Sequence, residues 1–488
     1  MDEESTKTQE NTTDSGILQD NRKIIEILLK NKKLVTPKAL ELIKEKNLLD
    51  KVLKLDKKII DETVLKNLEE PEIRIERNRK RKLAEEYNID FKLENIKIEH
   101  RERKSSDFIS YFNSKFSMVQ QMLARRVNPV SIANVKKTND NEVSLIGMVF
   151  DKRTTAAGNK IIELEDPTGM ITCMATKNSK TEVFDEFDNI LNDEVLGIKG
   201  YFKNNYVFIN EIIRPDIPIT NTMKKIDAPI SCVFISDLHI GSIDFLGDVF
   251  DKFIKWLNSK NAETVKYLFI AGDLVDGIGI YLNQESDLSI KSIHKQYEYA
   301  ANLLSKIPEH IRIIVQPGNH DIVGNQEPQR PLNETALSKL SNIEFGTTPC
   351  SVVLDNTFRI LMYHGYSYDY LIREIPGIRQ DGYKKPYLPM LEVLKRRHFV
   401  STHGSSLVIP ELVDSMVIDK VPDIFHSGHL HTVALENYKN VLVINSGTFQ
   451  GRTKFQEMQG HIPHPGIFAH VNLQTRDSKL INLNNLKL

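Results

Sequence analysis

Two residues of types that bind metal ions, Asp237 and His239, come shortly after the apolar run Cys232–Ile235, separated from it by Ser236. Such a run is typical of a buried strand, so the sequence predicts that both polar residues lie at the carboxyl end of a strand. Side chains alternate along an extended chain, and residues two apart can therefore point the same way. A carboxylate and an imidazole placed together can form part of a metal site, although this pair alone is common.

Five later segments repeat the arrangement, in which an apolar run ends in residues of metal-binding type beside a glycine. They are Gly272-Asp273, Gly318-Asn319-His320-Asp321, His364-Gly365, His403-Gly404 and Gly428-His429-Leu430-His431. Loops at strand ends converge on one edge of a sheet, which would bring these groups together. Carboxylate and imidazole donors suit manganese, iron, zinc or magnesium. The three cysteines lack a metal-binding spacing, which argues against a thiolate zinc centre.

Four of these motifs, taken in order, resemble the signature of the calcineurin-like metallophosphoesterases. They are Asp237-x-His239, Gly272-Asp273-x-x-Asp276, Gly318-Asn319-His320-Asp321 and Gly428-His429-x-His431. Each motif is common by chance, but all four in order at predicted strand ends favour a functional site over an accidental arrangement. The resemblance implies two divalent metal ions, with manganese expected and magnesium, iron or zinc as alternatives, that activate water for attack on phosphorus.

The resemblance also implies a role for each residue of the motifs. One metal ion would be held by Asp237, His239, Asp273 and His431. Asp273 would bridge to a second ion, whose other ligands would be Asn319, His364 and His429, with His403 as the alternative to His364. His320 would protonate the leaving 3′-oxygen or stabilise its charge, and Asp321 would orient its imidazole. Asp276 is expected to cap the following turn.

Residues 230–488 are predicted to form the metallophosphoesterase domain that positions these motifs. Strand-like and helix-like stretches alternate from Ile230 onward, which favours a layered α/β fold. The later strand-like stretches have less helix between them, so we expect a mixed α/β sandwich.

Residues 107–218 are predicted to form a helix followed by a small β-barrel. Helical periodicity covers 108–126, and five strand-like runs with one helical interruption follow. Five such strands are typical of an oligonucleotide-binding fold. Its basic side chains are candidates to line a path for single-stranded DNA: Lys152, Arg153, Lys160, Lys177 and Lys203. The alternative is that the barrel only packs against its neighbours.

The first hundred residues change character twice. Residues 1–20 are polar and predict a disordered tail, whereas apolar residues at helical spacing in 21–68 predict a small helical module. Residues 69–106 carry many charges of both signs and are predicted to form a charged linker. Either DNA or a partner protein can dock on the helical module, and the lack of a base-reading pattern favours a protein.

The composition limits the possible classes of function. The 488 residues include 65 Lys and Arg against 66 Asp and Glu, so no global basic field indicates a nucleic-acid binder, and any such surface must be local. Neither a long apolar run nor a signal-peptide pattern occurs, which predicts a cytoplasmic protein without membrane partners. The cysteine usage fits a reducing compartment.

The order of the predicted barrel and phosphoesterase, with Asn445–Gln450 and the later Pro463-His464-Pro465, resembles the small subunits of archaeal family D DNA polymerases. This resemblance covers about residues 108–488. It implies a component of a DNA-directed DNA polymerase that carries 3′–5′ exonuclease, hence proofreading, activity on single-stranded or mismatched 3′ ends. The implied partners are a large catalytic subunit, DNA and a sliding clamp. The alternatives are a metallophosphatase or phosphodiesterase with a non-DNA substrate, and a non-catalytic scaffold subunit.

Overall fold

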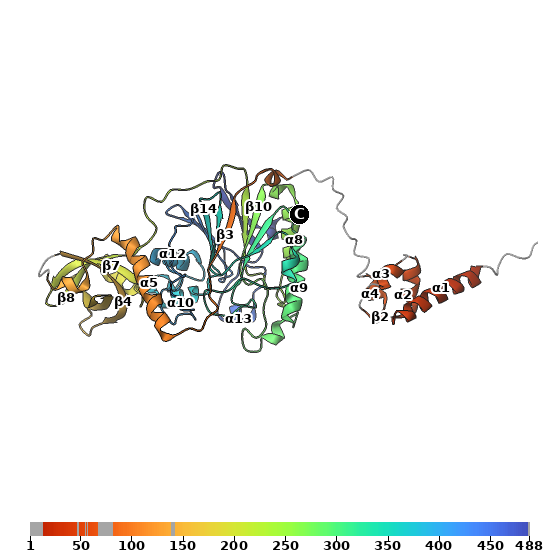
Figure 1. Ribbon diagram of the computed structural model, residues 1–488, viewed down its shortest axis with the longest axis horizontal. Helices are drawn as coiled ribbons and strands as arrows, with labels where there is room; N and C mark the ends of the chain where they lie inside the picture. The colour runs from red at the N-terminus through yellow and green to blue at the C-terminus, as the bar shows by residue number, and fades with distance from the viewer. Residues whose placement is uncertain are drawn as a thin grey trace, which may run out of the picture. The chain divides into compact units, whose positions relative to one another are not determined.

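The computed structural model describes residues 13–45, 48–53, 55, 57–66, 82–137 and 142–486. By its internal contacts the chain divides into two compact units, residues 1–80 and 81–488. Figure 1 labels their elements. Within the described ranges, no helix is long and apolar enough to cross a membrane.

The first unit is a small set of helices with one short pair of parallel strands. Its elements are α1 (Thr13–Lys30), β1 (Leu34–Val35), α2 (Pro37–Glu45), α3 (Leu49–Leu53), β2 (Ile59–Ile60) and α4 (Glu62–Lys66). Leu28, Ala39, Ile43, Val52 and Leu65 pack into a common apolar core. Helix α1 begins at Thr13, inside the predicted tail, while residues 1–12 of that tail lie outside the described residues.

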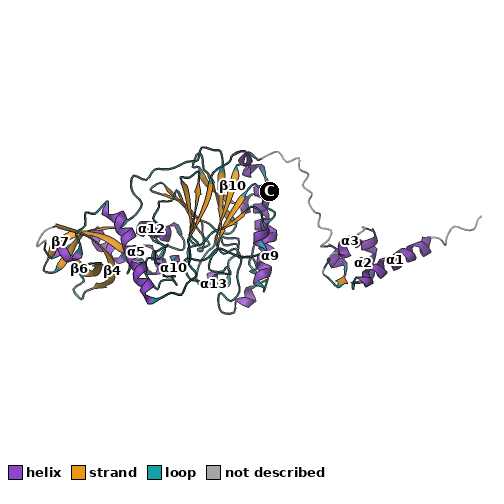
Figure 2. Cartoon of the chain, viewed as in Figure 1, coloured by secondary structure: helices purple, strands orange, loops and turns teal. Residues whose placement is uncertain are grey.

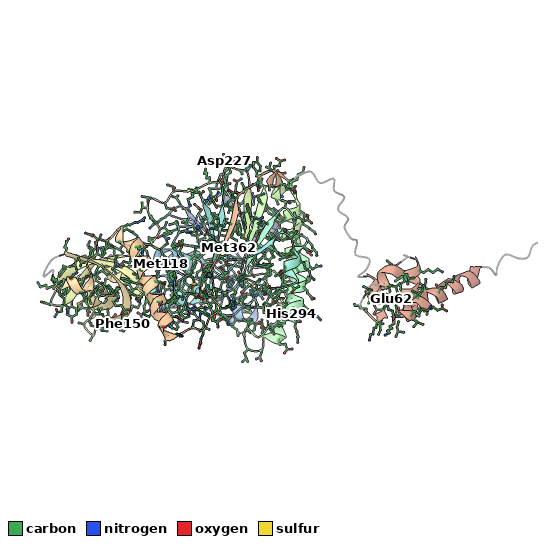
Figure 3. The ribbon with its side chains drawn as sticks, in the orientation of Figure 1. Glu62, Met118, Phe150, Asp227, His294 and Met362 are labelled. Atoms are coloured by element: carbon green, nitrogen blue, oxygen red, sulfur yellow. The ribbon has the colours of Figure 1, made fainter. Side chains whose placement is uncertain are left out.

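The second unit is built around two six-stranded sheets that pack face to face. One has the order β12 (Ile343–Phe345), β11 (Arg312–Gln316), β10 (Val265–Ala271), β9 (Ser231–Ile235), β18 (Ile467–Asn472) and β19 (Ser478–Asn482). The other has the order β16 (Ala434–Tyr438), β17 (Val441–Asn445), β15 (Ile424–Ser427), β14 (Phe358–Met362), β13 (Cys350–Leu354) and β3 (Phe91–Asn95). Met362, labelled in Figure 3, is fully buried in the core between them.

Helices cover the outer faces of the two sheets (Figure 2). Helices α8 (Gly247–Asn258) and α9 (Ile293–Leu304) pack on the sheet that contains β10, through Phe253, Leu257 and Tyr297. The opposite outer face carries α10 (Tyr368–Glu374), α11 (Pro376–Arg379) and α12 (Tyr387–Arg396). The short helix α13 (Lys454–Met458) lies in a loop after β17. The predicted mixed α/β sandwich is therefore confirmed.

A closed five-stranded barrel precedes this sandwich, as the alternation of short strands predicted. Its order is β4 (Glu142–Thr154), β5 (Lys160–Asp166), β6 (Gly169–Ala175), β8 (Tyr206–Ile213) and β7 (Val195–Lys203), with α7 (Thr181–Glu186) between β6 and β7. Helix α5 (Ser105–Ala124) packs on the barrel, and α6 (Ile132–Val135) precedes β4. The ammonium of Lys115 on α5 donates to the Ser401 carbonyl at 2.5 Å, which ties the helix to the sandwich as well.

The prediction of a charged linker at 69–106 is wrong for its carboxyl-terminal part. Residues 91–95 form β3, which pairs antiparallel with β13 and closes one edge of a sheet. The Phe91 ring stacks on Tyr267 with centroids 5.9 Å apart, so this segment adds to the core. Residues 69–81 of the predicted linker lie outside the described residues.

Candidate metal centre

The polar motifs lie where the parallel strands of both sheets end. Strands β9, β10 and β11 run parallel in one sheet, and β14 and β15 run parallel in the other, so their carboxyl ends share one edge of the sandwich. The backbone there is unusual, because several non-glycine residues have positive φ: Asp237 (53°), His239 (50°), Asp273 (50°), His429 (70°) and His431 (56°). Such left-handed conformations cluster at functional sites, where the surrounding structure holds them.

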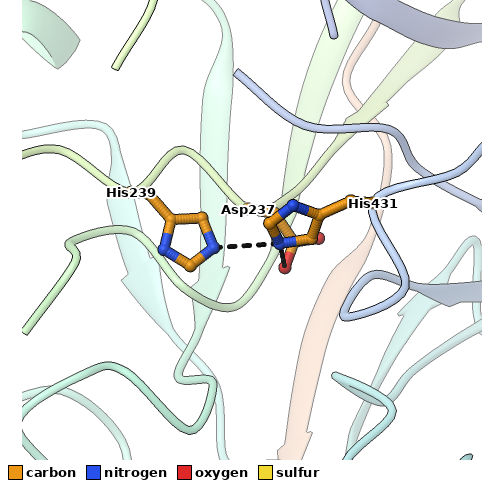
Figure 4. A group of neighbouring side chains, drawn as sticks. All are labelled: Asp237, His239 and His431. Carbon is orange, nitrogen blue, oxygen red and sulfur yellow. Dashed lines mark hydrogen bonds and ion pairs between the residues drawn. The ribbon is translucent and has the colours of Figure 1, made fainter. Parts of the chain in front are cut away.

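The first group of possible metal ligands consists of Asp237, His239 and His431 (Figure 4). The Nε2 atoms of the two imidazoles are 3.0 Å apart, and His431 Nε2 lies 3.5 Å from Asp237 Oδ1. All three side chains are buried. The atoms that would bind an ion therefore already face a common point.

A second group consists of Asp237, Asp273 and His364. His364 Nε2 lies 3.4 Å from Asp273 Oδ2 and 2.9 Å from Asn319 Oδ1, and His429 Nδ1 lies 3.1 Å from the same amide oxygen. Asp273 Oδ2 also lies 3.7 Å from His239 Nε2. Asp273 therefore stands between the two groups, as a bridging ligand would.

The second nitrogen of each imidazole is engaged by a neighbouring polar group. His239 Nδ1 contacts Asp276 Oδ1 at 3.0 Å, and His364 Nδ1 contacts the Ala271 carbonyl at 2.8 Å. His429 Nε2 contacts Asp369 Oδ2 at 2.8 Å, and His431 Nδ1 contacts Gln456 Nε2 at 2.8 Å. Partners of this kind hold the rings of metal-binding histidines in orientation.

Two glycines allow the ligand loops to approach one another closely. A Cβ atom at Gly318 would lie 2.2 Å from Asp273 Oδ1, and one at Gly428 would lie 2.4 Å from Asp237 Oδ2. Any side chain at either position would displace a carboxylate of the centre. The glycines beside the predicted ligands are thus required by packing.

The electrostatics of this centre fit cations. Burial and the Asp273 carboxylate raise the pKa of Asp237 to about 6, although His364 opposes the shift. Burial lowers the pKa of His364, but Asp273 and Asp237 outweigh it and raise that pKa to about 10. Divalent ions would offset the repulsion between these buried carboxylates and would bind the imidazoles that converge on them. The oxygen and nitrogen donors present therefore fit the metals that the motifs predict.

His320 and Asp321 do not pair as predicted. The Asp321 carboxylate accepts from the Gly318 N–H at 2.9 Å and from the Tyr297 hydroxyl at 2.8 Å, so it holds the loop in shape. His320 Nδ1 instead faces the Asp276 carbonyl at 2.8 Å. Its ring also falls in a third group with His239 and Asp276 whose ligand atoms lie within 4.8 Å of one another. Asp321 therefore holds the loop, and the Asp276 carbonyl, not Asp321, is the partner of the His320 ring.

The structure brings His364, and not His403, to the predicted ligands. The His403 ring packs edge-on against Phe108 and Phe112 of α5, at 5.2 and 5.6 Å. Its backbone N–H donates to Asp193 Oδ2 at 2.9 Å. None of the three groups found among the described residues includes His403.

The basic side chains predicted to line a DNA path on the barrel differ in their environment. Lys160 is only 7% exposed, and its ammonium lies 2.9 Å from Asp188 Oδ1 and 4.0 Å from the centroid of Phe184. It is therefore withdrawn from any ligand, which corrects the prediction for this residue. Of the other four basic residues, Lys152 donates to backbone carbonyls and Arg153 pairs with acidic side chains. Lys177 and Lys203 are exposed.

Several residues of the site were missed or misread from the sequence. Asp276 was expected to cap a turn, but it is buried and contacts His239. The cleft above the predicted metal ligands is also lined by Tyr281, Asp369, Tyr383, Gln456 and His461. The Gly-His-x-His pattern could not reveal Gln456, because Gln456 lies 25 residues after His431, beyond strands β16 and β17.

Comparison with known proteins gives consistent matches. Residues 230–433 match the family described as calcineurin-like phosphoesterase. The DNA polymerase II small subunit of Methanothermobacter thermautotrophicus is 40% identical over 381 residues, which are 75% of this chain and 77% of that protein. The protein of the same name from Archaeoglobus fulgidus is 43% identical over 376 residues, 74% of each chain. That from Pyrococcus horikoshii is 35% identical over 421 residues, 80% of this chain and 67% of that protein.

Proposed function

The chain belongs to the family of archaeal DNA polymerase II small subunits, and from this premise we propose that its phosphoesterase domain is a metal-dependent 3′–5′ exonuclease. The observation that carries the proposal is the pair of buried ligand groups that share Asp237 and are joined by Asp273. Two adjacent sites of this kind suit the in-line displacement of a phosphodiester.

The residues that would hold the two ions are Asp237, His239, Asp273 and His431 for one, and Asp273, Asn319, His364 and His429 for the other. When bound there, divalent ions, with manganese proposed, supply Lewis-acid activation of the phosphate and of the attacking water. Asp276 and Asp369 hold two of the imidazoles in orientation.

His320 would act on the leaving group. It lines the cleft, and its Nδ1 is engaged by the Asp276 carbonyl, which leaves Nε2 to face the substrate. In its doubly protonated form, the imidazolium would give its Nε2 proton to the leaving 3′-oxygen or stabilise the charge on that oxygen. The products would be a nucleoside 5′-monophosphate and a DNA strand shortened by one residue with a free 3′-hydroxyl.

The remaining parts of the chain would serve the polymerase. The barrel has five strands with the third and fifth parallel, an arrangement that suits an oligonucleotide-binding fold and could guide a single strand. The relatives are named small subunits, so a large catalytic subunit is the proposed partner.

The proposal is tested with the purified full chain, manganese and a single-stranded oligonucleotide labelled at its 5′ end. We expect a ladder of labelled products that shorten one nucleotide at a time, both alone and with the large subunit. A labelled mononucleotide released first would show the opposite direction. Hydrolysis of bis(p-nitrophenyl) phosphate without any cleavage of DNA would instead favour a phosphodiesterase for another substrate.

A further inference from the structure

The cleft above the predicted metal ligands has two chemically different parts. Its volume is about 300 Å³, and its floor includes Asp273, Asn319 and His429. Its wall is formed by aromatic and apolar side chains: Tyr281, Tyr383, Leu430, Phe455, His461 and Pro463. The polar residues of the floor are sufficient to bind a phosphate. The aromatic and apolar residues of the wall therefore indicate that the ligand also has a flat apolar part.

One side of the wall is a stacked pair of rings that is tied to the floor. Tyr383 and His461 lie with ring centroids 4.2 Å apart and planes inclined by 28°. The Tyr383 hydroxyl donates to Asp369 Oδ1 at 2.7 Å, and Asp369 Oδ2 contacts His429 Nε2 at 2.8 Å. The stack is therefore held at a set position relative to a predicted metal ligand.

The other side of the wall is presented by α13. Thr453 and Gln456 cap this helix reciprocally, and Gln456 Nε2 also contacts His431 Nδ1. The Gln456 carbonyl accepts from the His461 N–H at 2.8 Å, so the helix and the stack form one unit. Phe455, on the same helix, lines the cleft and is 61% exposed. Tyr281, which is 44% exposed, lines the same cleft, and exposed apolar side chains that gather along a groove mark a ligand-binding site.

We propose that Tyr383, Phe455 and His461 form a nucleobase subsite, which stacks the base of the nucleotide whose phosphate lies on the floor. The inference rests on the proposed exonuclease and assigns the substrate-recognition residues of that same cleft. Stacking on aromatic rings tolerates every base, because each base has a π-face. A base can enter only when it is unpaired, so the subsite selects frayed or mismatched ends over paired ones.

Binding of a product tests the subsite without relying on turnover. Full-length protein with manganese is titrated calorimetrically with thymidine 5′-monophosphate and with deoxyribose 5-phosphate, which lacks the base. We expect about tenfold tighter binding of the nucleotide, the size typical of stacking one base. Phe455→Ala should bring the two affinities together, whereas Phe455→Trp should keep the difference.

Met458→Ala is the matched control, because Met458 lies on the same short helix, is 77% exposed and does not line the cleft. This variant should bind both ligands as the wild type does. Equal affinities for the two ligands in the wild type, or an unchanged preference in Phe455→Ala, would overturn the subsite.

A matched pair of oligonucleotides separates the subsite from the proposed activity. They differ only in the 3′-terminal residue, which is thymidine in one and an abasic analogue in the other. If thymidine is removed faster than the abasic residue, and this difference is lost in Phe455→Ala, the result supports both the subsite and the exonuclease. Cleavage of both strands at equal rates would overturn the subsite and leave the exonuclease standing. Selective nucleotide binding without any DNA cleavage would overturn the exonuclease and leave the subsite standing.

Discussion

Asp276 is a buried carboxylate that holds a predicted metal ligand in place and is not itself one of the predicted ligands. Its Oδ1 contacts His239 Nδ1 at 3.0 Å and Gln450 Nε2 at 3.2 Å, and its Oδ2 accepts from Gln284 Nε2 at 3.1 Å. The Asp276 carboxylate therefore holds the ring of His239 in orientation, and Gln284 and Gln450 hold the carboxylate in place.

Replacing this carboxylate should weaken metal binding. Asp276→Ala is expected to lower the affinity for manganese by about 10- to 100-fold, because the His239 ring loses its orienting partner. Titration of the metal-free protein with manganese measures the effect. Asp276→Asn keeps an acceptor oxygen and should therefore retain part of the affinity for manganese that Asp276→Ala loses. Asp248→Ala, on the exposed face of α8, is the control, and an equal affinity in both alanine variants would contradict the role.

His320 can be separated from the ligands by comparing turnover with metal content. His320→Ala should reduce exonuclease turnover by about 10²- to 10⁴-fold, because the leaving oxygen loses its proton donor. Its manganese content, measured by elemental analysis, should match that of the wild type. Loss of metal would make His320 a ligand, as its proximity to His239 and Asp276 allows. His294→Ala is the control, since that side chain is exposed on α9 (Figure 3).

At the scale of elements, α12 joins the sandwich to the barrel through a buried ion-pair network. Arg396 on α12 is 3% exposed, and its Nε lies 2.5 Å from Oε2 of Glu194, which precedes β7. Arg214 lies 3.1 Å from the same carboxylate, and Glu392 pairs with Arg396 along the helix. The barrel and the sandwich are therefore connected by charges that water does not reach.

Removing the central cation of this network should destabilise the whole second unit. Arg396→Met is expected to lower the free energy of unfolding by about 3–5 kcal/mol, because two buried carboxylates lose their main partner. Lys395→Met breaks a neighbouring, more exposed pair with Glu392 and should cost about 0–1 kcal/mol. Urea unfolding of both variants measures the difference. An equal loss in free energy of unfolding for the two variants would show that burial of the ion pairs does not add to stability.

Strand β3 is an element that local sequence patterns did not reveal. In the strand Phe91–Asn95, the first four residues alternate apolar and charged side chains, within a region dense in charge. Their strand conformation depends on pairing with β13, more than 250 residues later, and on the stacking of Phe91 on Tyr267. Since a short strand is stable only in a sheet, its neighbours decide its structure.

At the scale of the whole molecule, the candidate metal centre lies within one of the two units of the chain. The predicted metal ligands, the cleft, the barrel and α5 all belong to residues 81–488, which have their own apolar cores. The first unit has a separate small core. Each unit therefore has the features of an independent domain.

Deletion of residues 1–80 should leave the catalytic centre intact. We expect the shortened chain to hydrolyse a short single-stranded oligonucleotide with an unchanged kcat/KM and to unfold at the same temperature as the second unit of the full chain. Nuclease assays and calorimetry on both proteins test this. A lower kcat/KM for the shortened chain would assign the first unit a part in binding DNA.

The sequence by itself determined the class of chemistry and the architecture that supports it. Alternating strand-like and helix-like stretches predicted the sandwich, and five short strand-like runs predicted the barrel. Apolar runs that end in Asp, Asn or His beside glycine predicted residues that meet at one edge of the sandwich. Only the tertiary structure decided which His-Gly pair joins the centre, what Asp276 and Asp321 contact, and which rings form the cleft wall. These contacts join segments from different strands and loops, and no local pattern records which distant segment a side chain will meet.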